Sequence, residues 1–444
     1  MSVVDDLVSA IESIVKGRVD EYSVKVVRSR SVMVKLAKGE ISVTQSWDDL
    51  GVGLYIARDG KIAVLEYETS DPREAISRSV ELIDKLEKSP LYAPLPDASG
   101  EELSFVDPRV KEIAESGDAS GLISDLGLEE LGEVAGMIEA SYWEKRLVTS
   151  KGADFGEEGT SFEGYLRAFR GEASGQWSWV STSYDVGLAS RAVEKAVELA
   201  EECSKLPAEN PEPGRYRVLL SPMIAGNLIE TAARSLSAGA VFFGFSYFAD
   251  KKPGERVASE VFSLRETPRD SSLPFFAGFD DEGVATRDKE LISRGILKTF
   301  LHNTKTAKLM GAQTTGNAGW VLPRLFNLHV EPGDLSDGEL FDALGNGLYF
   351  TNNWYTRFQN YPQGQFSTVT RDAAFIVKNG KPVACTKRLR ISDTMPSLLS
   401  SIEALGKGLW QIKWWEVDVP TRLPHIIVSD LGISRPSLEG GPRL

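Results

Sequence analysis

Residues 53–67 have the sequence GLYIARDGKIAVLEY, and this stretch decides how the chain begins to fold. Asp59 and Gly60 lie between two alternating apolar runs, Gly53 to Ala57 and Lys61 to Tyr67. An Asp-Gly dipeptide in this setting is the strongest short signal for a β-hairpin. Further alternating runs precede it at residues 23–27, 32–36 and 41–44. We therefore predict that an antiparallel sheet forms the start of the chain.

Helical periodicity predicts several helices around this sheet. Apolar residues recur at helical spacing from Leu7 to Val15, before Gly17 ends the pattern. A second helix should begin with Asp71 as its cap and Pro72 in the first helical position, and extend to Leu86. The remaining predicted elements of this half are helices over 108–116, 128–142 and 186–200 and strands over 147–150, 161–169 and 176–183.

A break follows at residues 206–214, LPAENPEPG, where three prolines and a glycine exclude both a helix and a central strand. We predict a domain over 1–206, a linker over 207–214 and a second domain over 215–444. The second half is strand-rich, with a hairpin turn at Asn379-Gly380. Its predicted strands are 216–220, 257–264, 295–302, 325–331, 374–378 and 382–391, and its helices are 223–236 and 396–405.

The predicted fold class is α+β. The N-terminal domain should combine an antiparallel sheet with helices, and the C-terminal domain should be mostly antiparallel β structure with few helices. A chain of 444 residues exceeds the size at which one hydrophobic core stops growing, which agrees with two domains.

Composition narrows the function classes. Fifty basic and 64 acidic residues give a net charge of −14, which opposes binding to nucleic-acid phosphates. Residues 1–6 lack the basic and apolar segments of a signal peptide, and no apolar run reaches the roughly 18 residues of a membrane span. The two cysteines, Cys203 and Cys385, form no disulfide framework and agree with a reducing compartment. We expect a cytoplasmic protein that binds neither membrane nor nucleic acid directly.

Common catalytic motifs are missing. The three histidines, His302, His329 and His425, include no pair close enough for a zinc-binding HExxH helix, and each is interpreted as a packed or surface imidazole. No GxSxG elbow occurs. Ser13 and Lys16 form an SxxK, which we interpret as part of an ordinary helix. The glycines near 51–53 and 406–408 lack the other residues of a phosphate loop.

Two segments permit more than one interpretation. Asp280-Asp281-Glu282-Gly283 could perform acid–base chemistry or bind a hard cation, but an acidic surface turn is favoured. Trp410, Trp414 and Trp415 could form a stacking wall for a substrate. The favoured interpretation is packing, with Trp410 and Trp414 on one helical face.

Several segments together resemble the TldD/PmbA (TldE) family. The similar segments are Val218 to Gly226, Asp280 to Thr286, Gly295 to Leu297 and Thr314 to Ala318 in the second half, and Gly51 to Gly60 and Leu147 to Gly152 in the first. The resemblance spans nearly the whole chain and includes the label of a DNA gyrase modulator.

The resemblance also implies where a metal site would lie. Catalytic TldD-type subunits carry HExxxH on the helix after residues 218–222, with a cysteine further on. Here Ile229 and Arg234 stand at the histidine positions, and Glu230 coincides with the glutamate. An aliphatic group and a permanent cation cannot ligate zinc. Glu230 is a relic or, as favoured, the partner of Arg234 in a helix ion pair.

The third ligand is missing from the corresponding position as well. Residues 361–367, YPQGQFS, resemble the PmbA/TldE pattern and contain no cysteine, and Cys385 lies too far along the chain. We therefore expect no metal or cofactor in this chain and zinc in a partner subunit.

The leading hypothesis is a non-catalytic TldE-like subunit of an intracellular zinc metalloprotease that acts on peptides or unfolded segments. Edge strands near Gly316, Asn317 or Gln365 are candidates for guiding an extended substrate. The alternative is a non-enzymatic homodimer that binds peptides or a regulatory protein. A third possibility is an independent hydrolase whose site follows no known motif.

Overall fold

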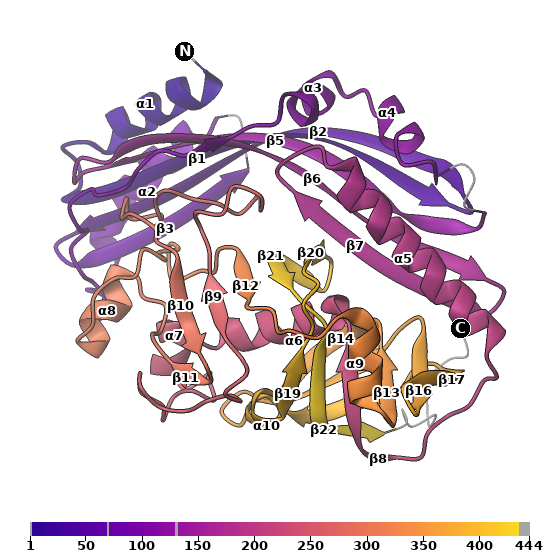
Figure 1. Cartoon of the computed structure of the whole chain (residues 1–444). Coiled ribbons are helices and arrows are strands. Elements are labelled where there is room, and N and C mark those ends of the chain that lie inside the picture. Colours follow the sequence, from indigo (N-terminus) through magenta and orange to yellow (C-terminus); the bar gives the residue numbers. More distant parts are fainter. Residues whose placement is uncertain (1, 69–70, 129–131, 435–444) are drawn as a thin grey trace.

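The computed structural model describes residues 2–68, 71–128 and 132–434. Helices make up 23% and strands 41% of the chain, which confirms the mixed α+β class. In Figure 1 the sheet of the first half arches over the second half, with α1, α3 and α4 on its outer side. Among the described residues, no helix is long and apolar enough to cross a membrane.

The first sheet has the strand order β3-β2-β1-β5-β6-β4, and β7 also pairs with β6. Its strands are β1 (Glu21–Ala37), β2 (Glu40–Arg58), β3 (Lys61–Glu68), β4 (Ser104–Phe105), β5 (Val134–Thr149), β6 (Asp154–Arg170) and β7 (Ala173–Ser181). The predicted hairpin is confirmed: β2 and β3 pair in antiparallel register across Asp59 and Gly60, whose φ angles are 50° and 76°. Positive φ at both central residues is what this tight turn requires.

The helices of this half are α1 (Val3–Val15), α2 (Arg73–Leu82), α3 (Pro108–Ser116), α4 (Ser120–Ser124) and α5 (Val186–Lys205), with a 3₁₀ turn over Ile83–Lys85. The α1 helix starts with a capping box between Ser2 and Asp5 and buries its apolar face against β1 and β5. The predicted helices at 108–116 and 186–200 are confirmed. The helix after Asp71 begins one residue later than predicted, because Pro72 is its cap.

The helix predicted over 128–142 is wrong. Residues 129–131 lie outside the described residues, and residues 134–142 belong to β5. That strand pairs with β1 on one side and β6 on the other, so its backbone is satisfied by partners distant in sequence. Val134, Ile138 and Ala140 are buried by this pairing, and their spacing fits a strand as well as a helix.

The second half contains two sheets. A nine-stranded sheet has the order β14-β15-β18-β22-β8-β13-β16-β17, with β19 paired to β22, and a six-stranded sheet has the order β11-β10-β9-β12-β21-β20. The strands are β8 (Gly214–Leu220), β9 (Leu264–Glu266), β10 (Lys289–Ser293), β11 (Ile296–Leu297), β12 (Leu328–Val330), β13 (Gly347–Phe350), β14 (Asn353–Asn360), β15 (Gln365–Thr370), β16 (Ala374–Lys378), β17 (Lys381–Thr386), β18 (Arg390–Thr394), β19 (Ile402–Leu405), β20 (Trp410–Trp414), β21 (Val417–Leu423) and β22 (Ile426–Ser434).

Five helices accompany these sheets: α6 (Pro222–Arg234), α7 (Ala238–Phe242), α8 (Thr304–Met310), α9 (Asp337–Leu344) and α10 (Met395–Ser400). The hairpin turn at Asn379-Gly380 is confirmed between β16 and β17. The strand predicted over 257–264 is wrong apart from Leu264, and the helix predicted to Leu405 stops at Ser400, where β19 follows. Trp410 and Trp414 share a strand, β20, so the predicted helical face is wrong.

A disulfide corrects the expectation that the two cysteines form no disulfide framework. Cys203 on α5 and Cys385 on β17 have Cα atoms 5.3 Å apart and are bonded to each other. Next to the bond, the backbone of Cys385 exchanges hydrogen bonds with the proline-rich segment at Pro207 and Glu209. The two cysteines therefore no longer support the expectation of a reducing compartment.

The hydrophobic interior continues across the predicted domain boundary, because one buried apolar cluster includes both Trp177 and Met223. The boundary itself stays a prediction.

Candidate functional site

Helix α6 carries the positions where the family motif would lie. Ser221 caps it by accepting a hydrogen bond from the Met223 N–H, and Pro222 occupies the first helical position. The helix packs against β21, β20, β14 and β8, so nearly all of its side chains are buried. We refer to Ile229, Glu230 and Arg234 on this helix as the α6 site.

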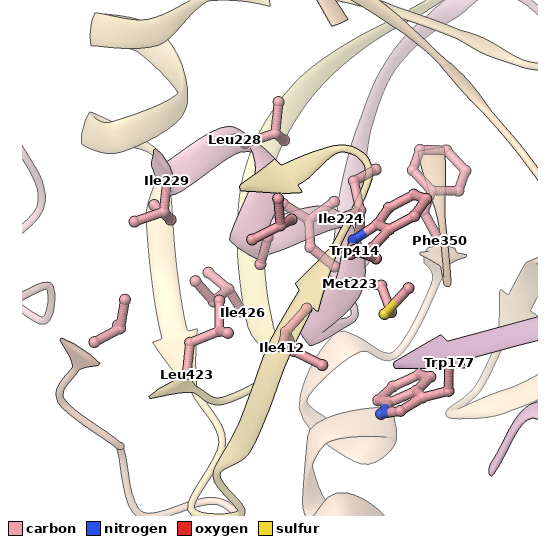
Figure 2. Close-up of a cluster of buried hydrophobic side chains, with 14 of the residues drawn as sticks. Trp177, Met223, Ile224, Leu228, Ile229, Phe350, Ile412, Trp414, Leu423 and Ile426 are labelled. Carbon is pink, nitrogen blue, oxygen red and sulfur yellow. The ribbon is translucent and has the colours of Figure 1, made fainter. Parts of the chain in front are cut away.

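Ile229 is part of the hydrophobic interior. Its side chain is 2% exposed and lies in the cluster shown in Figure 2, together with Leu228, Ile412 and Leu423. Packing of this kind excludes water and offers no lone pair to a metal. The first position of the expected ligand set is therefore filled by a core residue.

Glu230 uses both of its carboxylate oxygens inside the protein. One oxygen accepts a hydrogen bond from Arg234 Nε at 2.8 Å, and the other accepts one from the Val419 N–H at 3.1 Å. The expected ion pair with Arg234 is present. Burial raises the pKa of Glu230, although Arg234 opposes that shift. Arg234 is half-exposed and also contacts Asp418 at 3.1 Å.

The region of the third ligand is equally unsuited to zinc. Residues 361–364 connect β14 to β15, and Cys385 is on β17, at the other edge of the same sheet, where it is committed to the disulfide. Among the described residues, no three His, Cys, Asp or Glu side chains are grouped so that they could hold a metal ion. The residues of the α6 site therefore do not fit a zinc ion.

In the described part of the chain none of the three candidate guiding residues itself lies on a free strand edge, and their guiding role stays a prediction. Gln365 begins β15, which is paired with β14 on one side and β18 on the other. Gly316 is in a loop, and Asn317 is fully buried with its amide hydrogen-bonded to Glu266. The free edge near this region belongs to β14.

Two of the three histidines, His302 and His425, are buried, and His329 is partly buried beside Glu331. Burial lowers the pKa of His302 and of His329, and it lowers the pKa of His425 to about 3. His425 lies near Trp177 and Tyr349, with ring centroids about 6 Å apart. A lowered pKa favours the uncharged form of each imidazole.

The acidic segment 280–283 is buried, so its interpretation as a surface turn is wrong. Asp280 is 0%, Asp281 4% and Glu282 3% exposed. Asp280 accepts hydrogen bonds from the N–H groups of Glu282, Val284 and Ala318. Burial and the neighbouring Glu282 carboxylate raise the pKa of Asp280 to about 7.

Cations from distant parts of the chain neutralise this segment. Lys25 on β1 contacts Asp281 at 2.7 Å, Arg324 contacts it at 3.5 Å, and Lys305 contacts Glu282 at 3.3 Å. Burial alone would raise the pKa of Asp281, but Arg324 and Lys25 hold it below its usual value. The segment thus fastens the second half to the inner face of the first sheet.

A cavity of about 450 Å³ opens beside these ion pairs, between the inner face of the first sheet and loops of the second half. We call it the interdomain cavity; its lining includes Lys25, Trp143, Lys145, Phe276, Arg324 and Lys413. A second cavity of about 510 Å³ shares Glu163, Phe275 and Lys413 with it. That second cavity reaches Trp415 and Asp418, so it ends next to Arg234 of the α6 site.

Two tryptophans fit different interpretations made from the sequence, one as a packing residue and one as part of a stacking wall. Trp414 is buried, as expected for packing, whereas Trp415 is 43% exposed and lines the second cavity. Sequence reasoning missed the interdomain cavity altogether. No local signal marked it, because Lys25 and Lys145 lie on the more polar faces of their strands, where alternation predicts contact with solvent.

Comparisons with known proteins agree on one family. Residues 213–435, about half of the chain, match the family model described as the PmbA/TldA metallopeptidase C-terminal domain. Residues 22–83 match domain 1 and residues 77–202 match the central domain of the same metallopeptidases.

Individual relatives are similar at lower coverage. A metalloprotease of Methanocaldococcus jannaschii is 32% identical over 237 residues, which make up 50% of this chain and 49% of that protein. A zinc metalloprotease TldD homolog of Saccharolobus solfataricus is 26% identical over 276 residues, 59% of each chain. The chain therefore spans about half the length of these curated relatives. The crystal structure of TldE from Thermococcus kodakarensis has a TM-score of 0.81 at 20% identity, covering 98% of this chain and 100% of that one, which shows a shared fold.

Proposed function

This chain belongs to the PmbA/TldD metallopeptidase family, and on that premise we propose that it is a non-catalytic, TldE-like subunit of a zinc metalloprotease. A TldD-type partner with an HExxxH helix would supply the zinc, and the substrates would be peptides or unfolded segments. The observation that carries the proposal is the α6 site, where the buried Ile229 and the ion-paired Arg234 stand at the metal-ligand positions.

The state of Glu230 supports the same proposal. A glutamate that acts as a general base needs a free oxygen directed at a water molecule, and in metallopeptidases the metal activates that water. Both oxygens of Glu230 are engaged by Arg234 and by the Val419 N–H. We therefore assign Glu230 a structural role in this chain.

The two connected cavities support a role in holding substrate. They follow the inner face of the first sheet and expose aromatic and charged side chains, a mixture suited to extended peptides of varied sequence. The free edge of β14 offers a second way to align a peptide strand, in place of Gln365 on β15. The net charge of −14 argues against direct binding to nucleic acid. A cytoplasmic location remains part of the proposal.

The test is purification of the chain, tagged at its chromosomal locus, from its own host without denaturant, followed by native mass spectrometry and metal analysis. The proposal predicts a complex with a protein that carries HExxxH, and zinc in proportion to that protein. An unrelated protein with the same tag controls for adventitious capture. Recovery of this chain only as a monomer or homodimer would contradict the subunit role and favour the regulatory homodimer.

A further inference from the structure

We propose that the interdomain cavity binds the free C-terminal carboxylate of a short peptide, through a cationic subsite made by Lys25, Lys145 and Arg324. The inference concerns the chain alone and rests on the proposed function only for the choice of a peptide as the ligand. It adds to the subunit role a stated orientation and a stated end group for the peptide.

The charges of the subsite do not balance. Its three cations have two buried carboxylate partners: Lys25 and Arg324 share Asp281, and Lys145 pairs with Glu157 at 2.5 Å. The neighbouring acids are already engaged, because Lys305 pairs with Glu282 and Lys289 pairs with Glu266. One positive charge of the subsite is thus left without a carboxylate of its own.

Arg324 is the cation of the subsite whose N–H donors are least well paired. Its carboxylate contact in the described part of the chain, to Asp281, is 3.5 Å, which is longer than a good charge-assisted hydrogen bond. Within the described part of the chain, its Nε atom is buried and has no hydrogen-bond partner. Guanidinium groups recognise carboxylates through two parallel N–H donors, and the Arg324 side chain is 38% exposed, so a peptide carboxylate would approach its outer nitrogens.

Because the cations of the subsite are buried, a bound anion would stabilise them. The pKa of Lys25 and that of Lys145 are both lowered by burial and by the nearby Arg324, while Asp281 and Glu157 oppose the shift. The lowering by Arg324 shows that the three cations repel one another across the subsite. A bound carboxylate would reduce this repulsion in surroundings where screening by water is weak.

Aromatic rings form the walls beside the subsite. Phe276 and Trp143 have ring centroids 5.1 Å apart, and both rings lie over Gly159 of β6. A Cβ atom at Gly159 would approach each ring to 2.6 Å, so the glycine permits this close packing. Arg324 also lies over the ring of Phe326, at 4.9 Å from its centroid. The walls suit the apolar side chain of a terminal residue.

The opposite end of the cavity is acidic, which fixes the direction of the peptide. Glu139 and Glu163 are direct partners across β5 and β6, and among the described residues Lys413 forms its ion pair with Glu163, at 2.5 Å. Glu139 therefore remains to attract a peptide ammonium group. Glu139 and Lys145 lie six positions apart on β5, about 20 Å at the usual rise of a strand. An extended peptide of about five residues matches that length.

The experiment measures binding of one pentapeptide, Ala-Ala-Leu-Ala-Phe, to the purified full chain by isothermal titration calorimetry. The free acid and the C-terminal amide are compared, with inorganic phosphate as a competitor. Loss of a charge-assisted hydrogen bond predicts that the amide binds at least about tenfold more weakly than the acid. Equal affinities, or displacement of both peptides by phosphate, would overturn the proposal.

Two variants locate the effect. Arg324→Gln should remove the preference for the free acid, and Arg324→Lys should retain part of it. Arg287→Gln alters an exposed arginine of the same half of the chain that does not line the cavity, and it should bind as the wild type does. Thermal unfolding of each variant shows whether it has folded. If Arg324→Gln keeps the full preference, the subsite is wrong, while the absence of an HExxxH partner would remove only the subunit role.

Discussion

The α6 site and the interdomain cavity differ in whether their buried polar groups all have partners. At the α6 site an isoleucine fills the core, and the one buried carboxylate has both oxygens engaged. In the interdomain cavity, three cations converge on two carboxylates beside open space. The position that the family motif marks is closed, whereas the buried ion pairs of the acidic segment 280–283 lie beside an open, charged cavity. The first region is filled by packing, and the second contains charged side chains around open space.

The largest expected effect comes from placing an imidazole in the closed region. Ile229→His should lower the free energy of unfolding by about 4 kcal/mol, because it removes apolar packing and buries a polar ring without partners. Urea unfolding measures the change. Ile229→Val is the matched control, with an expected cost of about 1 kcal/mol. A stable Ile229→His variant that binds zinc would show that the region is open to metal chemistry.

The stability of the region around the interdomain cavity should depend on its buried ion pairs. Asp281→Asn leaves Lys25 and Arg324 without their shared carboxylate, so we expect a loss of about 3 kcal/mol in the free energy of unfolding at pH 7. The surface pair of Arg28 and Asp48 provides the comparison, since Asp48 is about half-exposed. Asp48→Asn should cost about 0.5 kcal/mol. Equal costs for the two substitutions would mean that the cavity charges are as well solvated as surface charges.

The disulfide fastens α5 to β17, away from both sites, so its loss should change stability and leave both sites intact. Replacing Cys203 and Cys385 by alanine should lower the free energy of unfolding by about 3 kcal/mol. Protein purified without reductant and then unfolded should show no reactive thiol. Two reactive thiols per chain, with an unchanged urea midpoint in the variant, would mean that the bond does not form in solution.

The smallest expected effect is a pH dependence of stability caused by the buried His425. Burial lowers the pKa of His425 to about 3, whereas an unfolded histidine titrates near 6.5. Between these values the unfolded state binds the proton more tightly, so stability is fully present above pH 6.5 and decreases as the pH falls toward 3. From pH 8 to pH 5 the loss attributable to His425 should be about 2 kcal/mol.

The variant His425→Phe isolates this contribution. Urea unfolding at both pH values should show a smaller pH-dependent loss in the variant than in the wild type. If the two proteins lose the same stability between pH 8 and pH 5, the imidazole of His425 is accessible to water and the interior near Trp177 is less closed than its burial indicates.

Sequence reasoning succeeded where the signal is local. The Asp59-Gly60 hairpin, the α3 helix and the β16 strand depend on neighbouring residues, and their positions were predicted correctly. The Glu230–Arg234 ion pair is local in the same sense, since its members are one helical turn apart.

The failures share a dependence on distant partners. Residues 134–142 form a strand because β1 and β6 lie on either side, and the acidic segment is buried because Lys25, 256 positions away from Asp281, reaches it. Cys203 and Cys385 meet across 182 positions. Periodicity and composition carry no information about such pairings, so the interdomain cavity could not be predicted from the sequence.

Cleavage of an unfolded peptide by the purified chain tests the central claim, that this chain contributes no metal chemistry. The assay compares the chain alone, the chain with added zinc, and the chain mixed with an HExxxH-bearing relative from the same organism, each with and without a chelator. We predict no cleavage by the chain under either condition, and chelator-sensitive cleavage by the mixture above that of the relative alone. Cleavage by the chain alone that disappears in a Glu230→Gln variant would contradict the account.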